Sequence, residues 1–303
     1  MAADRQEVFM RSRRITTHKI QTMTAKGERI PMVTAYDYTQ ARIIDAAGIP
    51  MILVGDSLGN VVLGFDSTIP VTVDDMVRHC AAVVRGSERA LVVVDMPFMS
   101  YQVDAETALR NAGRLLQEGG AQAVKVEGGK PIAPIIRRLV DAGVAVMGHI
   151  GLTPQSVHKL GGYRIQGKTQ RSAEALIEDA IAIQEAGAFA IVLELIPVEL
   201  AAEITKRLDI PTIGIGAGMY TDGQVQVLYD MLGLGLEFKP KHAGDYATLG
   251  LTAKDALERY AADVRDGSFP TQANSFHVDV EPATAEDATP YGAGKAAAVK
   301  HGA

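Results

Sequence analysis

The chain has 303 residues, a length that α/β barrels routinely reach as one domain, and 47% of them are hydrophobic, which is enough for a large core. Thirty basic and thirty-six acidic residues give a net charge of −6, so nothing in the overall charge favours nucleic acid as a partner. No apolar run is long enough to cross a membrane and residues 1–14 lack the apolar segment of an export signal, so we expect a cytoplasmic protein with no membrane partner.

Strand-like and helix-like segments alternate from about residue 30 onward. Runs of apolar residues predict eight strands, at residues 32–35, 51–54, 91–94, 123–126, 145–148, 190–193, 212–215 and 225–228. Apolar residues at helical spacing lie between them and predict helices, one of which precedes the eighth strand and must be short. Thr72 (paired with Asp75) and Ser172 are the expected caps of two helices, Pro131 begins a third, and the last helix covers residues 253–264.

About eight strand–helix repeats indicate a parallel sheet. Polar residues follow many of the strands rather than one pair of them, which favours a closed (β/α)₈ TIM barrel over an open, doubly wound sheet. We expect one barrel domain at residues 15–277, a flexible arm at residues 1–14 and a disordered tail at residues 278–303, whose composition is rich in Ala, Gly and Lys.

Acidic residues stand at the ends of four predicted strands: Asp56, Asp95, Glu127 and Glu194. Lys125 lies two residues before Glu127, so both side chains point the same way from one strand. Several carboxylates in a barrel mouth repel one another unless positive charge lies between them, and oxygen ligands without a Cys or His motif favour Mg²⁺ over Zn²⁺. The alternative is that each acid only caps a helix or pairs with a surface Arg.

Glu194 ends an apolar strand with no basic residue near it in the sequence. A carboxylate in apolar surroundings could serve as a general base near neutral pH, although a ligand or ion-pair role stays open. His149 either orients the substrate or Glu194, or bonds a backbone carbonyl at the rim. Gly161 and Gly162, in the long connection at residues 151–171, are the hinges of a mobile lid or part of an ordinary surface loop.

A series of motifs in one order resembles the ketopantoate hydroxymethyltransferase family. The resemblance covers about residues 14–277, and the motifs that carry it stand at residues 34–38, 54–59, 66–68, 95–99, 124–129, 148–155, 194–197 and 213–218. Residues 239–242 match the family pattern only loosely, and the terminal tail has no place in it.

The resemblance implies a (β/α)₈ barrel of the phosphoenolpyruvate/pyruvate type. It also implies that a one-carbon unit passes from 5,10-methylenetetrahydrofolate to 3-methyl-2-oxobutanoate, giving 2-dehydropantoate for pantothenate synthesis. Family members form homo-oligomers, commonly decamers. The implied roles are Mg²⁺ binding by Asp56 and Asp95 with Glu127 as a further ligand or partner, substrate binding by Ser57 and Lys125, and proton acceptance by Glu194. His149 joins the candidate substrate-binding residues.

Two other functions compete with this one. A carbon–carbon lyase or mutase of the same superfamily would share Mg²⁺ and 2-oxo acid chemistry without folate. Such enzymes generally carry a cysteine on a loop over the site, whereas the one cysteine here, Cys80, lies in a predicted helix. A non-catalytic barrel that senses a 2-oxo acid is the second, and the presence of Lys125 and Glu194 together disfavours it, since a purely structural role needs neither.

Overall fold

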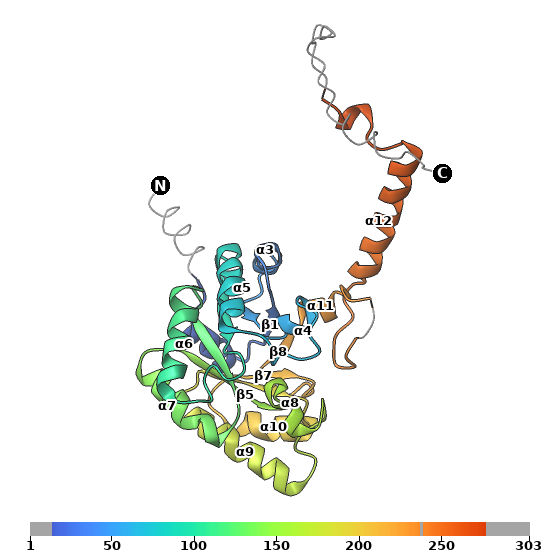
Figure 1. Cartoon of the computed structure of the whole chain (residues 1–303). Coiled ribbons are helices and arrows are strands. Elements are labelled where there is room, and N and C mark those ends of the chain that lie inside the picture. Colours follow the sequence, from blue (N-terminus) through green and yellow to red (C-terminus); the bar gives the residue numbers. More distant parts are fainter. Residues whose placement is uncertain (1–13, 237–238, 277–303) are drawn as a thin grey trace, which may run out of the picture. The chain divides into compact units, whose positions relative to one another are not determined.

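All eight predicted strands form in the computed structural model, which describes residues 14–236 and 239–276. Each strand pairs in parallel with the next, and the eighth pairs with the first, so the barrel is closed (Figure 1). The strands are β1 (Ile30–Thr34), β2 (Met51–Val54), β3 (Leu91–Asp95), β4 (Ala123–Glu127), β5 (Val146–Gly151), β6 (Ala190–Glu194), β7 (Thr212–Ile215) and β8 (Gly223–Gln226). The expected TIM-barrel fold is confirmed.

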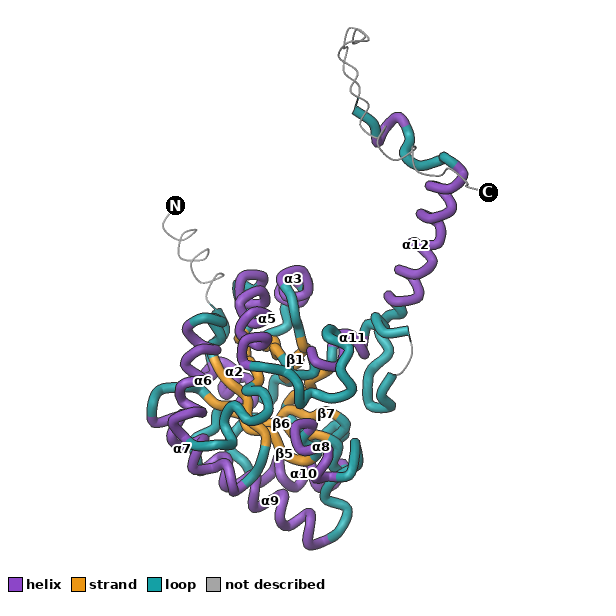
Figure 2. The backbone as a smooth tube through the Cα atoms, viewed as in Figure 1, coloured by secondary structure: helices purple, strands orange, loops and turns teal. Residues whose placement is uncertain are grey.

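Helices surround the strands and connect their ends (Figure 2). They are α2 (Thr17–Ala25), α3 (Tyr38–Ala46), α4 (Leu58–Val61), α5 (Val73–Gly86), α6 (Ala105–Gln117), α7 (Ala133–Asp141), α8 (Val157–Leu160), α9 (Gln170–Glu185), α10 (Val198–Arg207) and α11 (Leu228–Met231). Short 3₁₀ turns at Lys130–Ile132 and Pro154–Ser156 precede α7 and α8. No helix of the described ranges is long and apolar enough to cross a membrane.

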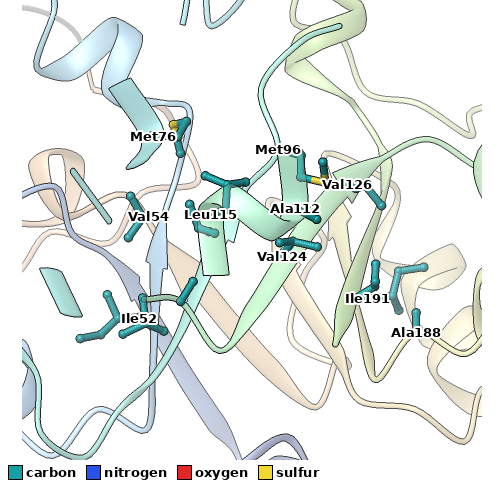
Figure 3. Close-up of a cluster of buried hydrophobic side chains, with 14 of the residues drawn as sticks. Ile52, Val54, Met76, Met96, Ala112, Leu115, Val124, Val126, Ala188 and Ile191 are labelled. Carbon is teal, nitrogen blue, oxygen red and sulfur yellow. The ribbon is translucent and has the colours of Figure 1, made fainter. Parts of the chain in front are cut away.

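Alternation along each strand divides the core into two layers. In β3, Leu91 and Val93 point into the barrel, whereas Val92 and Val94 point outward to the helices. The outer layer joins the strands to α5 and α6 through residues such as Met76 and Leu115 (Figure 3). The same alternation continues to the last residue of the strand, so Asp95 points inward at the barrel mouth.

Several predicted boundaries change in the structure. The Thr72–Asp75 capping box of α5 is confirmed, but Ser172 is the third residue of α9 and Thr169 is its cap. The helix expected from Pro131 begins as a 3₁₀ turn, and no helix lies between β7 and β8. Helix α2 was not predicted; its Ile20 is fully buried with the inner layer.

The chain divides into two compact units, residues 1–251 and residues 252–303. The second unit contains most of α12 (Leu249–Asp266), which includes the helix predicted at residues 253–264 and is longer at both ends. None of the residues of α12 is buried. Tyr260 contacts Phe269 edge to face, with the ring centroids 5.6 Å apart. The predicted tail at residues 278–303 and all of the predicted arm except Arg14 lie outside the described residues.

Candidate active site

The register of the strands brings five charged side chains together at the carboxyl end of the barrel. Asp95 is the strand neighbour of Lys125, and Glu127 is the strand neighbour of His149. Asp56 follows β2 after Gly55 and lies beside Asp95. All five are at least 94% buried, because their relative exposures run from 2% to 6%. The convergence predicted from the sequence is confirmed in position, and burial at this level excludes the alternative of surface ion pairs.

Lys125 lies at the centre of the cluster. Its Nζ is 3.1 Å from Asp95 Oδ1, 4.0 Å from Glu127 Oε1 and 3.1 Å from His149 Nδ1. Burial alone would lower the pKa of this ammonium group, but the neighbouring carboxylates outweigh burial and raise it. Lys125 therefore stays charged and can offset the carboxylate of an acidic substrate.

Asp56 and Asp95 form a close carboxylate pair. The backbone N–H of Asp56 donates to Asp95 Oδ2 over 3.0 Å. Burial, followed by the mutual repulsion of the two carboxylates and Glu127, raises the pKa of Asp56 well above its ordinary value. Burial likewise raises the pKa of Asp95, although Lys125 acts in the opposite direction. The mouth thus holds more negative charge than Lys125 alone can balance.

The donors of this pair fit a magnesium ion. Asp95 Oδ1 is a buried hard oxygen that lies 3.1 Å from Lys125 Nζ but accepts no hydrogen bond, so a lone pair remains for a cation. Within residues 14–236 and 239–276, no three His, Cys, Asp or Glu side chains form a ready metal cage. Mg²⁺ is commonly held by one or two carboxylates together with substrate oxygens and water, which suits Asp56 and Asp95. Glu127 as a third ligand stays a prediction.

Glu127 is occupied by protein partners. Its Oε1 is 3.3 Å from His149 Nδ1, and its Oε2 accepts the backbone N–H of Gln155 over 3.0 Å. Burial by itself raises the pKa of Glu127, but the hydrogen bond and charge of His149, together with Lys125, hold that pKa below its ordinary value. Glu127 is therefore an ionised partner of the positive groups in the cluster.

Glu194 does not have the apolar surroundings that the sequence predicts. His149 Nε2 lies 3.2 Å from Glu194 Oε2, and that expectation is wrong because strand pairing supplies a neighbour that is distant in the sequence. His149 is part of β5 rather than of the loop that follows it. Burial and the charge of Lys125 lower the pKa of His149, but the nearby carboxylates of Glu127 and Glu194 outweigh them and raise that pKa to about 9. His149 thus joins Glu194 to Glu127.

Gly151 permits the close approach of β5 to β6. It has φ of 94°, and a Cβ atom at this position would lie 2.1 Å from the backbone oxygen of Glu194. Only glycine fits such a contact in that conformation. The position of Glu194 therefore depends on the absence of a side chain at residue 151.

Ser57 occupies the edge of the cluster and is partly buried. Its hydroxyl lies 2.9 Å from the hydroxyl of Tyr36 and forms no side-chain cap for α4. Tyr36 is fully buried, and burial raises the pKa of its phenol. The acids at 95, 127 and 194 likewise cap no helix, because α6, α7 and α10 begin after Asp104, Ile132 and Pro197.

Sequence reasoning missed three polar residues of the site: Tyr36, Tyr101 and Gln155. Tyr101 and Gln155 are buried and hydrogen-bonded to each other and to the charged cluster. All three lie in connections after strands, where no periodic pattern marks the inward side chains. They lie two, six and four residues beyond the ends of β1, β3 and β5, so no feature of the sequence distinguishes them from other loop residues.

Comparisons with known proteins agree with one another. The family model described as ketopantoate hydroxymethyltransferase matches residues 14–272. A 3-methyl-2-oxobutanoate hydroxymethyltransferase of Chloroflexus aurantiacus is 61% identical over 266 residues, which are 88% of this chain and 94% of that protein. The enzyme of the same name from Dehalococcoides mccartyi is 58% identical, over 88% of this chain and 95% of that protein.

Solved structures share the fold at low identity. Phosphonopyruvate hydrolase gives a TM-score of 0.58 at 12% identity, with 86% of this chain and 92% of that chain covered. A 2,3-dimethylmalate lyase of the PEP mutase/isocitrate lyase superfamily gives 0.57 at 16% identity, with coverage of 84% and 86%. These similarities confirm the barrel fold that the sequence led us to expect.

Proposed function

Because this chain belongs to the ketopantoate hydroxymethyltransferase family, we propose that it adds a hydroxymethyl group to 3-methyl-2-oxobutanoate, giving 2-dehydropantoate for pantothenate synthesis. The one-carbon donor in this proposal is 5,10-methylenetetrahydrofolate. In the overall reaction the substrate loses its C3 proton, a C3–methylene bond forms, water supplies the hydroxyl group, and tetrahydrofolate leaves. The observation that carries the proposal is the juxtaposition of a carboxylate pair, Lys125 and the Glu194–His149 pair in one barrel mouth.

A cation bound by Asp56 and Asp95 is part of the proposal. When bound there, Mg²⁺ would act as a Lewis acid that polarises the 2-oxo group of the substrate. Phosphonopyruvate hydrolase, which has the same fold, has been solved in complex with oxalate and Mg²⁺, and this supports the choice of ion. Asp95 Oδ1 and the excess negative charge around it support the same choice here.

The chain's own residues divide the remaining work. Lys125, held by ion pairs to Asp95 and Glu127, offsets the substrate carboxylate, and Ser57 hydrogen-bonds the same end of the substrate. Glu194 removes the proton from C3, and the electron pair of the C–H bond moves toward the 2-oxo group. His149 holds Glu194 Oε2 at 3.2 Å, which fixes the direction of the base. Glu194 is 16% exposed at its side chain, so a substrate can reach it.

An assay of turnover tests the function. The purified protein is incubated with 3-methyl-2-oxobutanoate and methylenetetrahydrofolate, with Mg²⁺ or with a chelator, and 2-dehydropantoate is measured. We expect product only when both substrates and the cation are present. Cleavage of a 2,3-disubstituted malate without folate would instead assign the chain to the lyases. Such lyases generally carry a cysteine on a loop over the site, whereas Cys80 is buried in α5.

Assembly and location belong to the same proposal. Helix α12 exposes Leu257, Tyr260 and Val264, each at least 48% accessible, and a second copy of the chain would cover such residues. We propose a homo-oligomer, a decamer in line with the family, that works in the cytoplasm. Light scattering coupled to size exclusion measures the mass directly, and a monomer at micromolar concentration would refute this part.

A further inference from the structure

Gln155 lies in the 3₁₀ turn after β5, and every donor and acceptor of its side-chain amide forms a hydrogen bond near the carboxylates of the site. Its Nε2 donates to Asp56 Oδ2 over 2.8 Å and to the backbone oxygen of Met96 over 2.9 Å. Its Oε1 accepts from the Tyr101 hydroxyl over 2.9 Å and from Gln102 Nε2 over 3.0 Å. With two donors and two acceptors satisfied, the amide has no group left to bind a substrate.

The partners fix which way the amide points. The oxygens of Met96 and Asp56 are acceptors, so they must face the NH₂ group, and a flipped amide would place oxygen against oxygen at both contacts. Gln155 is only 4% exposed, so water does not replace these bonds. The position of Asp56 Oδ2 is therefore set by a rigid donor rather than by solvent.

Tyr101 supports Gln155 from the other side. The Tyr101 hydroxyl accepts the backbone N–H of Glu127 over 2.9 Å, and its proton is shared between Gln155 Oε1, 2.9 Å away, and the backbone oxygen of Glu127, 3.0 Å away. Tyr101 is fully buried, so its ring cannot swing away. The backbone N–H of Gln155 also donates to Glu127 Oε2. One residue thus orients a carboxylate from β2 and a carboxylate from β4.

We propose that Gln155, held by Tyr101, is a positioning residue for the divalent cation. It occupies Asp56 Oδ2 and thereby leaves Oδ1 of the same carboxylate for the ion, together with Asp95 Oδ1, which lies 3.1 Å from Lys125 Nζ but accepts no hydrogen bond. This inference rests on the proposed function, since it takes Asp56 and Asp95 as the cation ligands. Groups that hold a metal ligand in place typically affect metal affinity or activity by about 10–100-fold.

The chain offers a matched control in Gln122, at the opposite end of the barrel. Gln122 Oε1 accepts the backbone N–H of Val92 over 3.0 Å, and its Nε2 donates to the backbone oxygen of Gly120 over 2.7 Å. It is an amide with structural bonds and no contact with the charged cluster. Replacing it by Met removes the same chemical group and two hydrogen bonds, against four for Gln155, so it shows what loss of a structural amide alone does to cation binding.

The experiment compares Gln155→Met with Gln122→Met, using Mn²⁺ as the probe of cation binding. Free Mn²⁺ is measured by electron paramagnetic resonance in titrations without substrate, and Mg²⁺ is added as a competitor. We expect Gln155→Met to weaken Mn²⁺ binding by about 10–100-fold. Gln122→Met should stay within about twofold of the unaltered protein, because distant sites act independently. Circular dichroism and thermal melting of both variants establish that each is folded.

The outcomes separate this inference from the proposed function. If the unaltered protein binds no Mn²⁺, the proposed cation chemistry fails. If it binds Mn²⁺ and Gln155→Met binds equally well or more tightly, the positioning role is refuted; tighter binding would mean that the amide only dampens the charge of Asp56. Tyr101→Phe is the second variant, and it decides the question if Gln155→Met does not fold. We expect it to weaken binding by about tenfold, at the low end of the range, and unchanged affinity would overturn the proposal.

Discussion

The two ends of the barrel interior are built from the same strands and differ completely in chemistry. Toward the amino ends, the inward side chains are apolar: Ile30, Met51 and Leu91 pack with Ile20 of α2 at 1% exposure or less. Toward the carboxyl ends, the same strands present Asp95, and β4 adds Lys125 and Glu127. In β3 the change takes two residues, from Val93 to Asp95.

The difference shows how one fold separates stability from chemistry. We call the apolar interior at the amino ends of the strands the floor. Burial of its apolar groups stabilises the closed barrel, at about 25 cal/mol per Å² removed from water. The mouth, at the carboxyl ends, holds buried charges that destabilise the folded state unless they are paired. Ion pairs and hydrogen bonds among these side chains offset that cost of burial. Changes at the floor should therefore alter folding alone, and changes at the mouth should alter binding and rate.

The largest expected effect comes from a carboxylate of the mouth. Asp95→Asn removes a proposed cation ligand, and because a bound metal supplies several kcal/mol of charge stabilisation, we expect kcat/KM to fall by roughly 10³-fold. A chelator should have the same effect on the unaltered protein, and Mg²⁺ should restore it. Steady-state kinetics with a Mg²⁺ titration measures both.

Asp45→Asn is the matched control at the floor. The Asp45 carboxylate accepts the backbone N–H groups of Glu88, Arg89 and Ala90 just before β3. The same substitution there should lower the melting temperature and leave the dependence on Mg²⁺ unchanged. A changed Mg²⁺ dependence in Asp45→Asn would break the separation of the two ends.

Leu91→Ala tests the floor through its core. Leu91 is 1% exposed, and a buried Leu→Ala change typically costs about 2–5 kcal/mol because it leaves a cavity. We expect that loss in the free energy of unfolding, measured by denaturant titration, with kcat/KM per folded molecule unaltered. A loss of activity in fully folded protein would show that floor and mouth are coupled.

Gly151→Ala should lower both the stability of the fold and the rate of the reaction. An alanine at φ 94° is strained, and its Cβ would meet the backbone oxygen of Glu194. We expect a destabilisation of about 1–3 kcal/mol, together with a lower kcat as Glu194 is displaced. Gly143→Ala provides the control, since that glycine has φ of 89° with nothing within 4 Å of its Cβ position. The Gly143→Ala variant should be destabilised by backbone strain and should retain the kcat of the unaltered protein.

The smallest effect concerns the cap of α5, which lies on the mouth side but outside the charged cluster. Thr72→Ala should cost about 1 kcal/mol of stability with no kinetic change. Thr72 lowers the pKa of Asp75 in the folded protein, so this contribution is complete above the ordinary pKa of 3.8 and is lost as pH falls through the lower folded value. Melting curves at several pH values measure it.

The neutral capping box of α9 is its control. Thr169 caps this helix with Ser172 in place of an acid. The cost of Thr169→Ala should therefore stay constant over the acid range in which the cost of Thr72→Ala shrinks. A parallel decline in both would assign the pH dependence to some other group.

The sequence predicts the barrel and the charged mouth for the same physical reason. Inward and outward residues alternate with a period of two, so the inward placement of Lys125 and Glu127 follows from their spacing alone. Contacts across strands depend on register, which no short pattern records. The hydrogen bonds of Gln155 were missed on that account, and the approach of His149 to Glu194 was only one of the alternatives that the sequence left open.

The predictions of helices were wrong in places for a more local reason. Thr169 and Ser172 are both good caps, and the choice between them depends on where the long connection at residues 152–169 ends. Helix α2 is nine residues long and has one buried side chain, Ile20, so its periodic signal is weak. By contrast, the box at Thr72 and Asp75 satisfies both partners within four residues and is visible in the sequence.

The central claim is that Glu194 removes the C3 proton of the substrate in the charged mouth. In D₂O with Mg²⁺ and no folate, the protein should exchange the C3 hydrogen of 3-methyl-2-oxobutanoate, which collapses the splitting of its methyl signal in proton NMR. Glu194→Gln should slow this exchange by about 10²–10⁴-fold. Glu203→Gln, on the exposed face of α10, should exchange at the unaltered rate. Undiminished exchange in Glu194→Gln would contradict the account and assign the base to another residue.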